Sequence, residues 1–360
     1  MKPLFPTRGP STGTTRLDGT DIEGTIRRAL ASAGLLPGAG KVIPEALTAP
    51  GHARIDRIPA LGEPANDSFI ELARPGQFVS RSFSNATGTR PYKLYLPDQY
   101  AASMPLIVML HGCTQDPDDF AAGTRMNELA NRHGLLVAYP EQPRRANGSN
   151  CWNWFRAEDQ ARDRGEPSLI AGITREIQST YGVDRRRTFV AGLSAGAAMA
   201  VIMGATYPDL YAAIGVHSGL PYGAAHDIPS AFAAMRGPGG PLSTSARSAS
   251  KPSPTIVFHG DQDTTVNIRN GTRIVNQLIA QFADVGQPVT PDTSRQGGHS
   301  ATVTAYRDGT NRLLIEEWIL HAAGHAWSGG SPVGSFTDAT GPDASAEMVH
   351  FFLDRCGRSN

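Results

Sequence analysis

A serine stands at the centre of the pentapeptide Gly-Leu-Ser-Ala-Gly at residues 192–196. The apolar run 188–190 precedes it and a stretch of small residues follows it, which predicts a strand, a sharp turn at Ser194 and a helix. Such a turn lifts the serine hydroxyl above a helix N-terminus, whose N–H groups favour developing negative charge. The flanking glycines remove side chains that would collide with the strained backbone. This pattern is typical of a serine that attacks a carbonyl carbon.

A neutral hydroxyl is a poor nucleophile, so Ser194 requires a histidine that accepts its proton and a carboxylate that orients this histidine. When the nucleophile lies in a strand–turn–helix motif of this kind, the three residues follow one another along the chain in the order serine, carboxylate, histidine. The loop after the apolar run 255–258 supplies two carboxylates, of which Asp263 is the first candidate and Asp261 the alternative. The base is predicted to be His325, which follows a glycine in a loop beyond the last long predicted strand.

His321 lies four residues before His325, a spacing that also occurs in metal-binding pairs. Such a pair shares one face only on a helix and needs a third ligand, whereas His321 is expected near the end of a strand. We therefore predict that His321 is a packed histidine with hydrogen-bond partners, and we expect no metal site.

Attack on a carbonyl creates an oxyanion, which needs two preorganised donors. One candidate is the backbone N–H of Ala195, the residue after the nucleophile. The other is the N–H of Cys113, because the buried run 106–110 ends in His-Gly and the glycine lets the chain bend back toward the serine. A plain strand-ending turn is the alternative for this segment. His111, in the same turn, is a candidate for contact with the substrate.

Residues 150–155 read Asn-Cys-Trp-Asn-Trp-Phe, an unusually aromatic segment for a chain with four tryptophans. Such a cluster either lines a cleft for an acyl or aromatic group or covers the core. Trp152 and Trp154 are therefore candidates for contact with the substrate, and Trp327, two residues after His325, is a further candidate.

The chain has three cysteines, too few for a disulfide scaffold and without the paired spacing of a zinc site. Cys113 belongs to the segment that offers an oxyanion donor and Cys151 to the aromatic segment. A disulfide between them would tie two walls of one site together, and two free buried thiols are the alternative. Cys356 is predicted to be unpaired.

From about residue 77, apolar runs alternate with stretches that have the periodicity of a helix. The strands and helices of this pattern must position the candidate site residues. The pattern predicts a mainly parallel sheet with crossover helices. The strands are expected at residues 92–96, 106–110, 135–138, 188–190, 213–216, 255–258, 302–306 and 313–320, and the helices at 118–132, 168–181, 195–207, 272–282 and 344–354. Ser168 is the predicted cap of its helix. The turn at Asp308-Gly309 predicts that the last two strands form a hairpin.

Residues 1–76 are richer in Pro, Gly and Thr and are predicted to be an N-terminal extension with one short helix at 21–36. A targeting segment or pro-segment is the alternative for this part. Two further segments, 236–254 and 284–299, are predicted surface loops that either border a cleft or only connect elements.

The 360 residues include 33 Lys and Arg against 33 Asp and Glu, and no basic block stands out. This balance argues against nucleic acid and anionic membranes as partners. With 40% hydrophobic and 18% charged residues, the chain is also not expected to be disordered or a coiled coil. The N-terminal residues lack the apolar core of a secretory signal, and no stretch of eighteen strongly apolar residues predicts a membrane span.

Six segments, in this order, resemble the polyhydroxybutyrate (PHB) depolymerase-type esterases of the α/β-hydrolase superfamily, which have feruloyl and acetylxylan esterases as relatives. The segments lie at residues 110–115, 151–155, 191–199, 216–222, 259–263 and 324–327. The resemblance extends over roughly residues 77–353. It implies an α/β-hydrolase fold for the catalytic domain 77–360, with a mostly parallel twisted sheet flanked by helices.

The resemblance also implies a serine esterase with Ser194 as nucleophile, Asp263 rather than Asp261 as acid, His325 as base, and no metal or organic cofactor. The substrates it implies are short-chain hydroxyalkanoate esters, their oligomers or polyesters, with feruloyl or acetylxylan-type esters of plant polysaccharide as the alternative. It favours an extracellular or periplasmic protein, and we expect a monomer or weak homo-oligomer. The competing hypotheses are a non-catalytic binding protein on the same fold and a serine peptidase.

Overall fold

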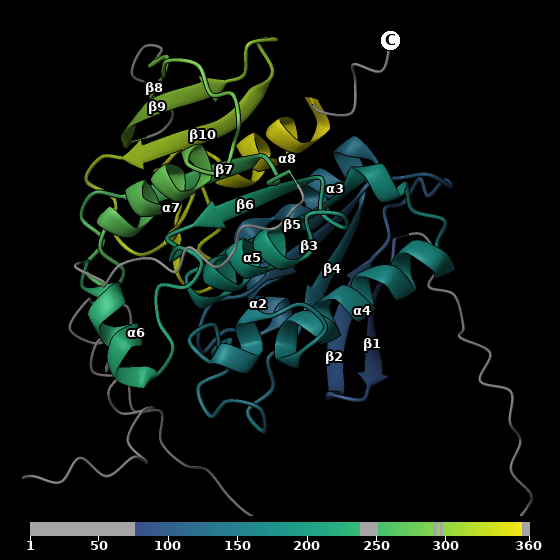
Figure 1. Ribbon diagram of the computed structural model, residues 1–360. Helices are drawn as coiled ribbons and strands as arrows, with labels where there is room; N and C mark the ends of the chain where they lie inside the picture. The colour runs from purple at the N-terminus through teal and green to yellow at the C-terminus, as the bar shows by residue number, and fades with distance from the viewer. Residues whose placement is uncertain (1–75, 238–250, 291–293, 296–297, 355–360) are drawn as a thin grey trace, which may run out of the picture.

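The computed structural model describes residues 76–237, 251–290, 294–295 and 298–354. The predicted helix at 21–36, nearly all of the predicted extension 1–76, most of the loop 236–254 and Cys356 lie outside these residues. The described strands form a ten-stranded sheet in the order β1-β2-β4-β3-β5-β6-β7-β10-β9-β8 and a separate pair, β11-β12 (Figure 1).

The strands of the large sheet are β1 (Phe78–Asn85), β2 (Gly88–Tyr95), β3 (Leu106–Leu110), β4 (Leu136–Pro140), β5 (Thr188–Leu193), β6 (Ala213–His217), β7 (Thr255–Gly260), β8 (Ser294–Arg295), β9 (Ser300–Arg307) and β10 (Leu313–Leu320). The small pair consists of β11 (Trp327–Ser328) and β12 (Thr337–Asp338). The α-helices are α2 (Pro117–Thr124), α3 (Met126–His133), α4 (Gly165–Thr180), α5 (Ala195–Thr206), α6 (Ile228–Met235), α7 (Arg269–Ile279) and α8 (Ala344–Asp354), with short 3₁₀ helices η1 (Ala157–Gln160) and η2 (Arg185–Arg187).

Six neighbouring strands, β4, β3, β5, β6, β7 and β10, run parallel, and antiparallel strands extend the sheet at both edges. Helices α4, α5 and α7 contribute to the apolar core on one face of the sheet, and α3 and α8 to the core on the other (Figure 1). Because both faces are covered, the parallel strands β3 to β7 are buried along their whole length and read as continuous apolar runs. The predicted mainly parallel sheet with crossover helices is confirmed.

Most predicted elements are present within a few residues of their predicted ends, and the hairpin between β9 and β10 is confirmed. The side chain of Asp308 closes its turn by accepting the backbone N–H groups of Thr310 and Arg312, each at 3.0 Å. The predicted helix 118–132 is instead two helices, because Arg125 adopts a φ of 53° between them. The predicted Ser168 cap is also wrong, since α4 begins at Gly165 and the Ser168 hydroxyl bonds to the Gly165 carbonyl within the first turn.

Of the elements with eight residues or more, β1 and α6 were not predicted. Helix α6 begins with a capping box, in which the Asp227 side chain accepts the Ser230 N–H at 2.8 Å and the Ser230 hydroxyl accepts the Asp227 N–H at 3.1 Å. In Figure 1 it stands beyond the strand ends, apart from the helices that cover the faces of the sheet. Within the described ranges, no helix is both long and apolar enough to cross a bilayer.

Candidate active site

Ser194 lies at the predicted turn between β5 and α5, with φ 57° and ψ −118°. A residue with a side chain rarely adopts a positive φ, so surrounding contacts must hold this conformation. The Ser194 N–H donates to the His217 carbonyl at 2.9 Å, and the Ser194 carbonyl accepts the Ala198 N–H at 2.9 Å. The serine is thus fixed from the neighbouring strand β6 and from its own helix.

Close backbone contacts explain the glycines of the turn. A Cβ atom at Gly196 would lie 2.0 Å from the Leu110 carbonyl oxygen, and one at Gly192 would lie 2.5 Å from the backbone of Gly196. Neither contact can be relieved by a side-chain rotation, because the opposing atoms belong to the backbone. The turn therefore packs against the end of β3 only with glycine at both positions.

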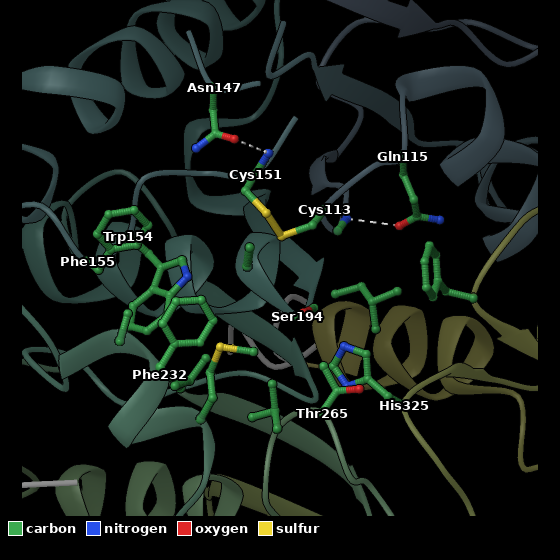
Figure 2. A pocket seen from close by; sticks show the side chains of 18 of the residues that line it. Cys113, Gln115, Asn147, Cys151, Trp154, Phe155, Ser194, Phe232, Thr265 and His325 are labelled. Atoms are coloured by element: carbon green, nitrogen blue, oxygen red, sulfur yellow. Dashed lines mark hydrogen bonds between the residues drawn. A yellow bond between two sulfur atoms is a disulfide. The ribbon is translucent and has the colours of Figure 1, made fainter. Parts of the chain in front are cut away.

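Asp263 and His325 form a buried pair, with 2.7 Å between Asp263 Oδ2 and His325 Nδ1. Asp263 Oδ1 accepts the backbone N–H groups of Thr265 at 2.9 Å and Val266 at 2.8 Å. Burial by itself would raise the pKa of Asp263, but attraction to His325 and these hydrogen bonds hold that pKa below its usual value. His325 lines the same pocket as Ser194 (Figure 2), and Asp263 joins them through its bond to His325.

The alternative carboxylate, Asp261, does not bond to His325. Its Oδ2 lies 3.0 Å from Nδ1 of His321, and its Oδ1 accepts the Ala322 N–H at 2.8 Å. The other ring nitrogen of His321 lies 2.8 Å from the Thr302 hydroxyl, so His321 has the predicted hydrogen-bond partners, although its side chain is partly exposed and not packed in the interior. Asp261 thus anchors the loop that carries His325 and leaves Asp263 as its partner.

Two further buried histidines, His217 and His259, lie beside this pair and were not singled out as site residues. Burial lowers the pKa of His217 to about 3, and its Nε2 accepts the Ser328 N–H at 3.1 Å. Burial also lowers the pKa of His259, whose Nε2 lies 2.7 Å from the Val266 carbonyl oxygen. Both rings are therefore neutral near pH 7 and pack the site without adding charge.

The candidate oxyanion residues Cys113 and Ala195 both line the pocket with Ser194. The N–H groups on either side of Cys113 already have acceptors. That of Gly112 donates to the Gln115 side chain at 2.9 Å, and that of Thr114 donates to the Ser149 carbonyl at 2.7 Å. No acceptor for the Cys113 N–H is found among the described residues. A free donor at this place is what an oxyanion requires.

A disulfide joins Cys113 to Cys151, which decides between the two alternatives for these cysteines. It ties the turn after β3 to the aromatic segment. In Figure 2, Ser194 lies between this bridge and His325.

Three residues predicted to contact substrate do not line the pocket. Trp152 is fully buried and donates from its ring nitrogen to the His111 carbonyl at 3.1 Å. His111 is buried as well, and its Nε2 accepts the Gln142 N–H at 3.0 Å. Trp327 stacks on His217 and donates to the Ser345 hydroxyl at 2.9 Å. These side chains stabilise the interior behind the site, so their assignment to substrate binding is wrong.

Trp154 does line the pocket. It belongs to an apolar wall that the aromatic segment and α6 form together. Trp154, Phe155 and Phe232 gather on one side of Ser194, while Gln115 lies on the other (Figure 2). The remaining apolar side chains of the pocket lining are those of Leu193, Ala195, Leu220, Ile228, Ala231, Met235, Val266 and Phe336. The contribution of α6 was not predicted, although the Asp227–Ser230 capping box before an apolar run indicates the start of a helix.

A buried carboxylate supports this aromatic wall from behind. Glu166 Oε2 accepts the Asn153 N–H at 2.8 Å and its Oε1 accepts the Asn153 side-chain amide at 2.8 Å, while Arg90 lies 3.6 Å away. Gln142 also donates to Glu166. The backbone between Trp152 and Trp154 is therefore positioned by a polar network that lies in the core.

Asp159 adds a second carboxyl group to this network, and its Oδ1 accepts the Glu166 N–H at 2.7 Å. Burial, together with the Glu166 carboxylate, raises the pKa of Asp159 to about 7. A raised carboxyl pKa favours the folded state at low pH, and this contribution is lost as the pH rises through the folded pKa.

We expect Asp159→Asn to remove this pH dependence, because asparagine keeps an acceptor for the Glu166 N–H but cannot ionise. Between pH 5 and pH 8 the wild-type protein should lose about 2 kcal/mol more of its free energy of unfolding than the variant. Urea unfolding at the two pH values measures the difference. Glu128→Gln, which removes an exposed carboxylate on α3, is the control. Equal losses in the wild-type protein and Asp159→Asn would contradict the role of Asp159.

Comparisons with known proteins find similar chains. A model of the family described as Esterase PHB depolymerase matches residues 90–302. The poly(3-hydroxyalkanoate) depolymerase C of Paucimonas lemoignei is 35% identical over 268 residues, which cover 70% of this chain and 62% of that protein. A probable acetylxylan esterase A of Aspergillus fumigatus is 33% identical over 171 residues, 43% of this chain and 45% of that protein. The matched stretches thus span less than two thirds of both relatives.

Among solved structures, the acetyl xylan esterase from Aspergillus awamori superposes with a TM-score of 0.59 at 20% sequence identity. The match covers 76% of this chain and 99% of that one. At this level of identity it shows a shared fold.

Proposed function

Because the chain belongs to the PHB depolymerase family of esterases and has the α/β-hydrolase fold, we propose that it hydrolyses carboxylic esters with Ser194 as the nucleophile. The observation that carries the proposal is the shared pocket of Ser194 and His325, with His325 bonded to the buried Asp263. The strained turn at Ser194 supports it, since strain of this kind is concentrated at functional sites.

In the proposed reaction, Ser194 Oγ attacks the ester carbonyl carbon and His325 Nε2 accepts its proton. Asp263 accepts the Nδ1 proton of His325, which leaves Nε2 as the unprotonated nitrogen and stabilises the imidazolium that forms. The N–H groups of Ala195 and Cys113 bind the oxyanion, and His325 then protonates the leaving alcohol. Water, activated by the same histidine, releases the acid from the acyl-enzyme.

The proposed substrates are short-chain hydroxyalkanoate esters, their oligomers or polyesters. The apolar wall of Trp154, Phe155 and α6 supports this choice, because alkyl side groups of such units gain from burial there. The similarity to a poly(3-hydroxyalkanoate) depolymerase points the same way. Feruloyl or acetylxylan-type esters of polysaccharide are the second candidate, which the similarity to an acetylxylan esterase favours. The Cys113–Cys151 disulfide fits an extracellular or periplasmic location, since disulfides persist in oxidising compartments.

A panel of substrates tests the proposal with one preparation. We expect turnover of p-nitrophenyl butyrate and of 3-hydroxybutyrate oligomers, with kcat/KM at least tenfold above that for methyl ferulate and acetylated xylan, which corresponds to about 1.4 kcal/mol of transition-state binding. Hydrolysis of polyester films would indicate an enzyme that acts on solid polymer, whereas hydrolysis of oligomers alone would indicate an oligomer hydrolase. The matching p-nitroanilide should be hydrolysed far more slowly than the p-nitrophenyl ester. Faster hydrolysis of the anilide would favour a peptidase, and an inert protein would favour a binding function.

A further inference from the structure

Arg156 carries the single permanent charge among the described residues that line the pocket. Two other polar side chains of the lining, those of Gln115 and Asn147, have partners within the protein. The Gln115 amide bonds to the Gly112 N–H and to Asp119, and the Asn147 side-chain oxygen accepts the N–H groups of Ser149 and Cys151. Of these groups, the guanidinium of Arg156 is therefore the one available to a charged group on a substrate.

The backbone of Arg156 is fixed while its side chain is exposed. Its N–H donates to the Asn153 carbonyl at 2.9 Å, and its carbonyl accepts the Asp159 N–H at 3.0 Å. The Asp159 carboxyl group accepts the Glu166 N–H and attracts the Arg156 guanidinium only from a distance, since no salt bridge of the Arg156 side chain occurs within the described residues. Arg156 follows Phe155 directly, so this cation adjoins the apolar wall.

A guanidinium binds a carboxylate through two parallel N–H···O bonds, which gives both energy and orientation. The apolar surface next to Arg156 excludes water on one side and so strengthens such a pair relative to one that is fully solvated. A carboxylate is also what a hydroxyalkanoate oligomer carries at its end, on the alcohol part of its last ester bond. Acetyl and feruloyl groups bring no carboxylate to the site.

We propose that Arg156 binds a free carboxylate of the substrate, and that the site thereby prefers the carboxyl-terminal ester bond of short hydroxyalkanoate oligomers. This inference rests on the proposed function, because it concerns which ester the same Ser194 attacks. Arg156 acts in substrate binding and takes no part in proton transfer.

The linear dimer of 3-hydroxybutyrate, which has one ester bond, tests the inference as the free acid and as its methyl ester. In Arg156→Gln we expect the ratio of kcat/KM for the acid to kcat/KM for the methyl ester to fall about fivefold to tenfold, mainly through KM of the acid. Arg156→Lys should keep part of the preference, since lysine retains the charge but loses the bidentate geometry. Raising the salt concentration should lower the wild-type ratio and leave that of Arg156→Gln unchanged.

Arg132→Gln is the matched control, because it removes an arginine that is also exposed and that belongs to α3, which contributes no residue to the pocket. Its acid-to-methyl-ester ratio should equal that of the wild-type protein. An unchanged ratio in Arg156→Gln, or an equal fall in Arg132→Gln, would overturn the inference. If the wild-type protein hydrolyses neither dimer nor any p-nitrophenyl ester, the proposed function itself fails. Hydrolysis of both dimers with no preference refutes the carboxylate site alone.

Discussion

Replacing Ser194 with alanine is expected to lower kcat for p-nitrophenyl butyrate about a million-fold, because in the proposed reaction Ser194 alone forms the acyl-enzyme. The residual rate would come from the oxyanion donors and from substrate binding. Alanine also fits the turn, since it is smaller than serine and meets the same backbone strain at a φ of 57°. The measurement is initial rate against enzyme concentration, with circular dichroism and thermal unfolding to show that the fold is retained.

Ser218→Ala is the matched control for this experiment. Ser218 is also buried and also has a positive φ, of 54°, but it does not line the pocket. We expect its activity to stay within tenfold of wild type and a fluorophosphonate probe to label it, whereas Ser194→Ala should not be labelled. Turnover by folded Ser194→Ala at more than a thousandth of the wild-type rate would exclude Ser194 as the nucleophile.

The parts of the fold that depend on local signals could be predicted from the sequence. Buried parallel strands appear as uninterrupted apolar runs because helices cover both faces, and the glycines around Ser194 reflect contacts with the end of β3. The turn, its flanking strand and its flanking helix were therefore predicted together. Helix α6 had an equally local signal in its capping box, but its eight residues are short for recognition by periodicity.

Which aspartate bonds to which histidine in the site depends on contacts between segments that are distant in the sequence. Local sequence patterns carry no information about these contacts. Asp261 and Asp263 lie in one loop and have the same chemistry, and only the position of the loop after β10 makes one bond to His321 and the other to His325. From the residues themselves the choice stayed open, and the family resemblance favoured Asp263.

The aromatic segment shows the same limit on a smaller scale. Trp152 and Trp154 are two residues apart and equally apolar, yet Trp152 turns inward to bond the His111 carbonyl while Trp154 faces the pocket. The orientation follows from Glu166, which holds Asn153 between them and comes from a helix more than ten residues later. No spacing rule in residues 150–155 predicts this contact.

Replacing Asp263 with asparagine should have the second largest effect, a fall in kcat of about 10⁴-fold. Asp263 Oδ2 accepts the proton on Nδ1 of His325, and an asparagine amide that turns its NH₂ group toward the ring would place the proton on Nε2 instead. Nε2 could then no longer accept the proton of Ser194. Because the proposed substrate binds chiefly to the apolar wall, we expect KM to change less than tenfold, and measurement of kcat and KM on p-nitrophenyl butyrate separates the two.

The pH dependence of stability gives Asp263→Asn a second signature. The lowered pKa of Asp263 means that its carboxylate stabilises the fold above the unfolded pKa, and that this contribution is lost as the pH falls through the folded pKa. The variant should therefore lose less of its free energy of unfolding than the wild-type protein when the pH is lowered from 6 to 3. Asp261→Asn, two residues earlier in the same loop, is the matched control, and its kcat should fall no more than about tenfold, since it holds the loop and not the base. A larger loss of kcat in Asp261→Asn than in Asp263→Asn would reverse the assignment of the carboxylate, because the aspartate that orients the base must be the one whose removal stops proton transfer.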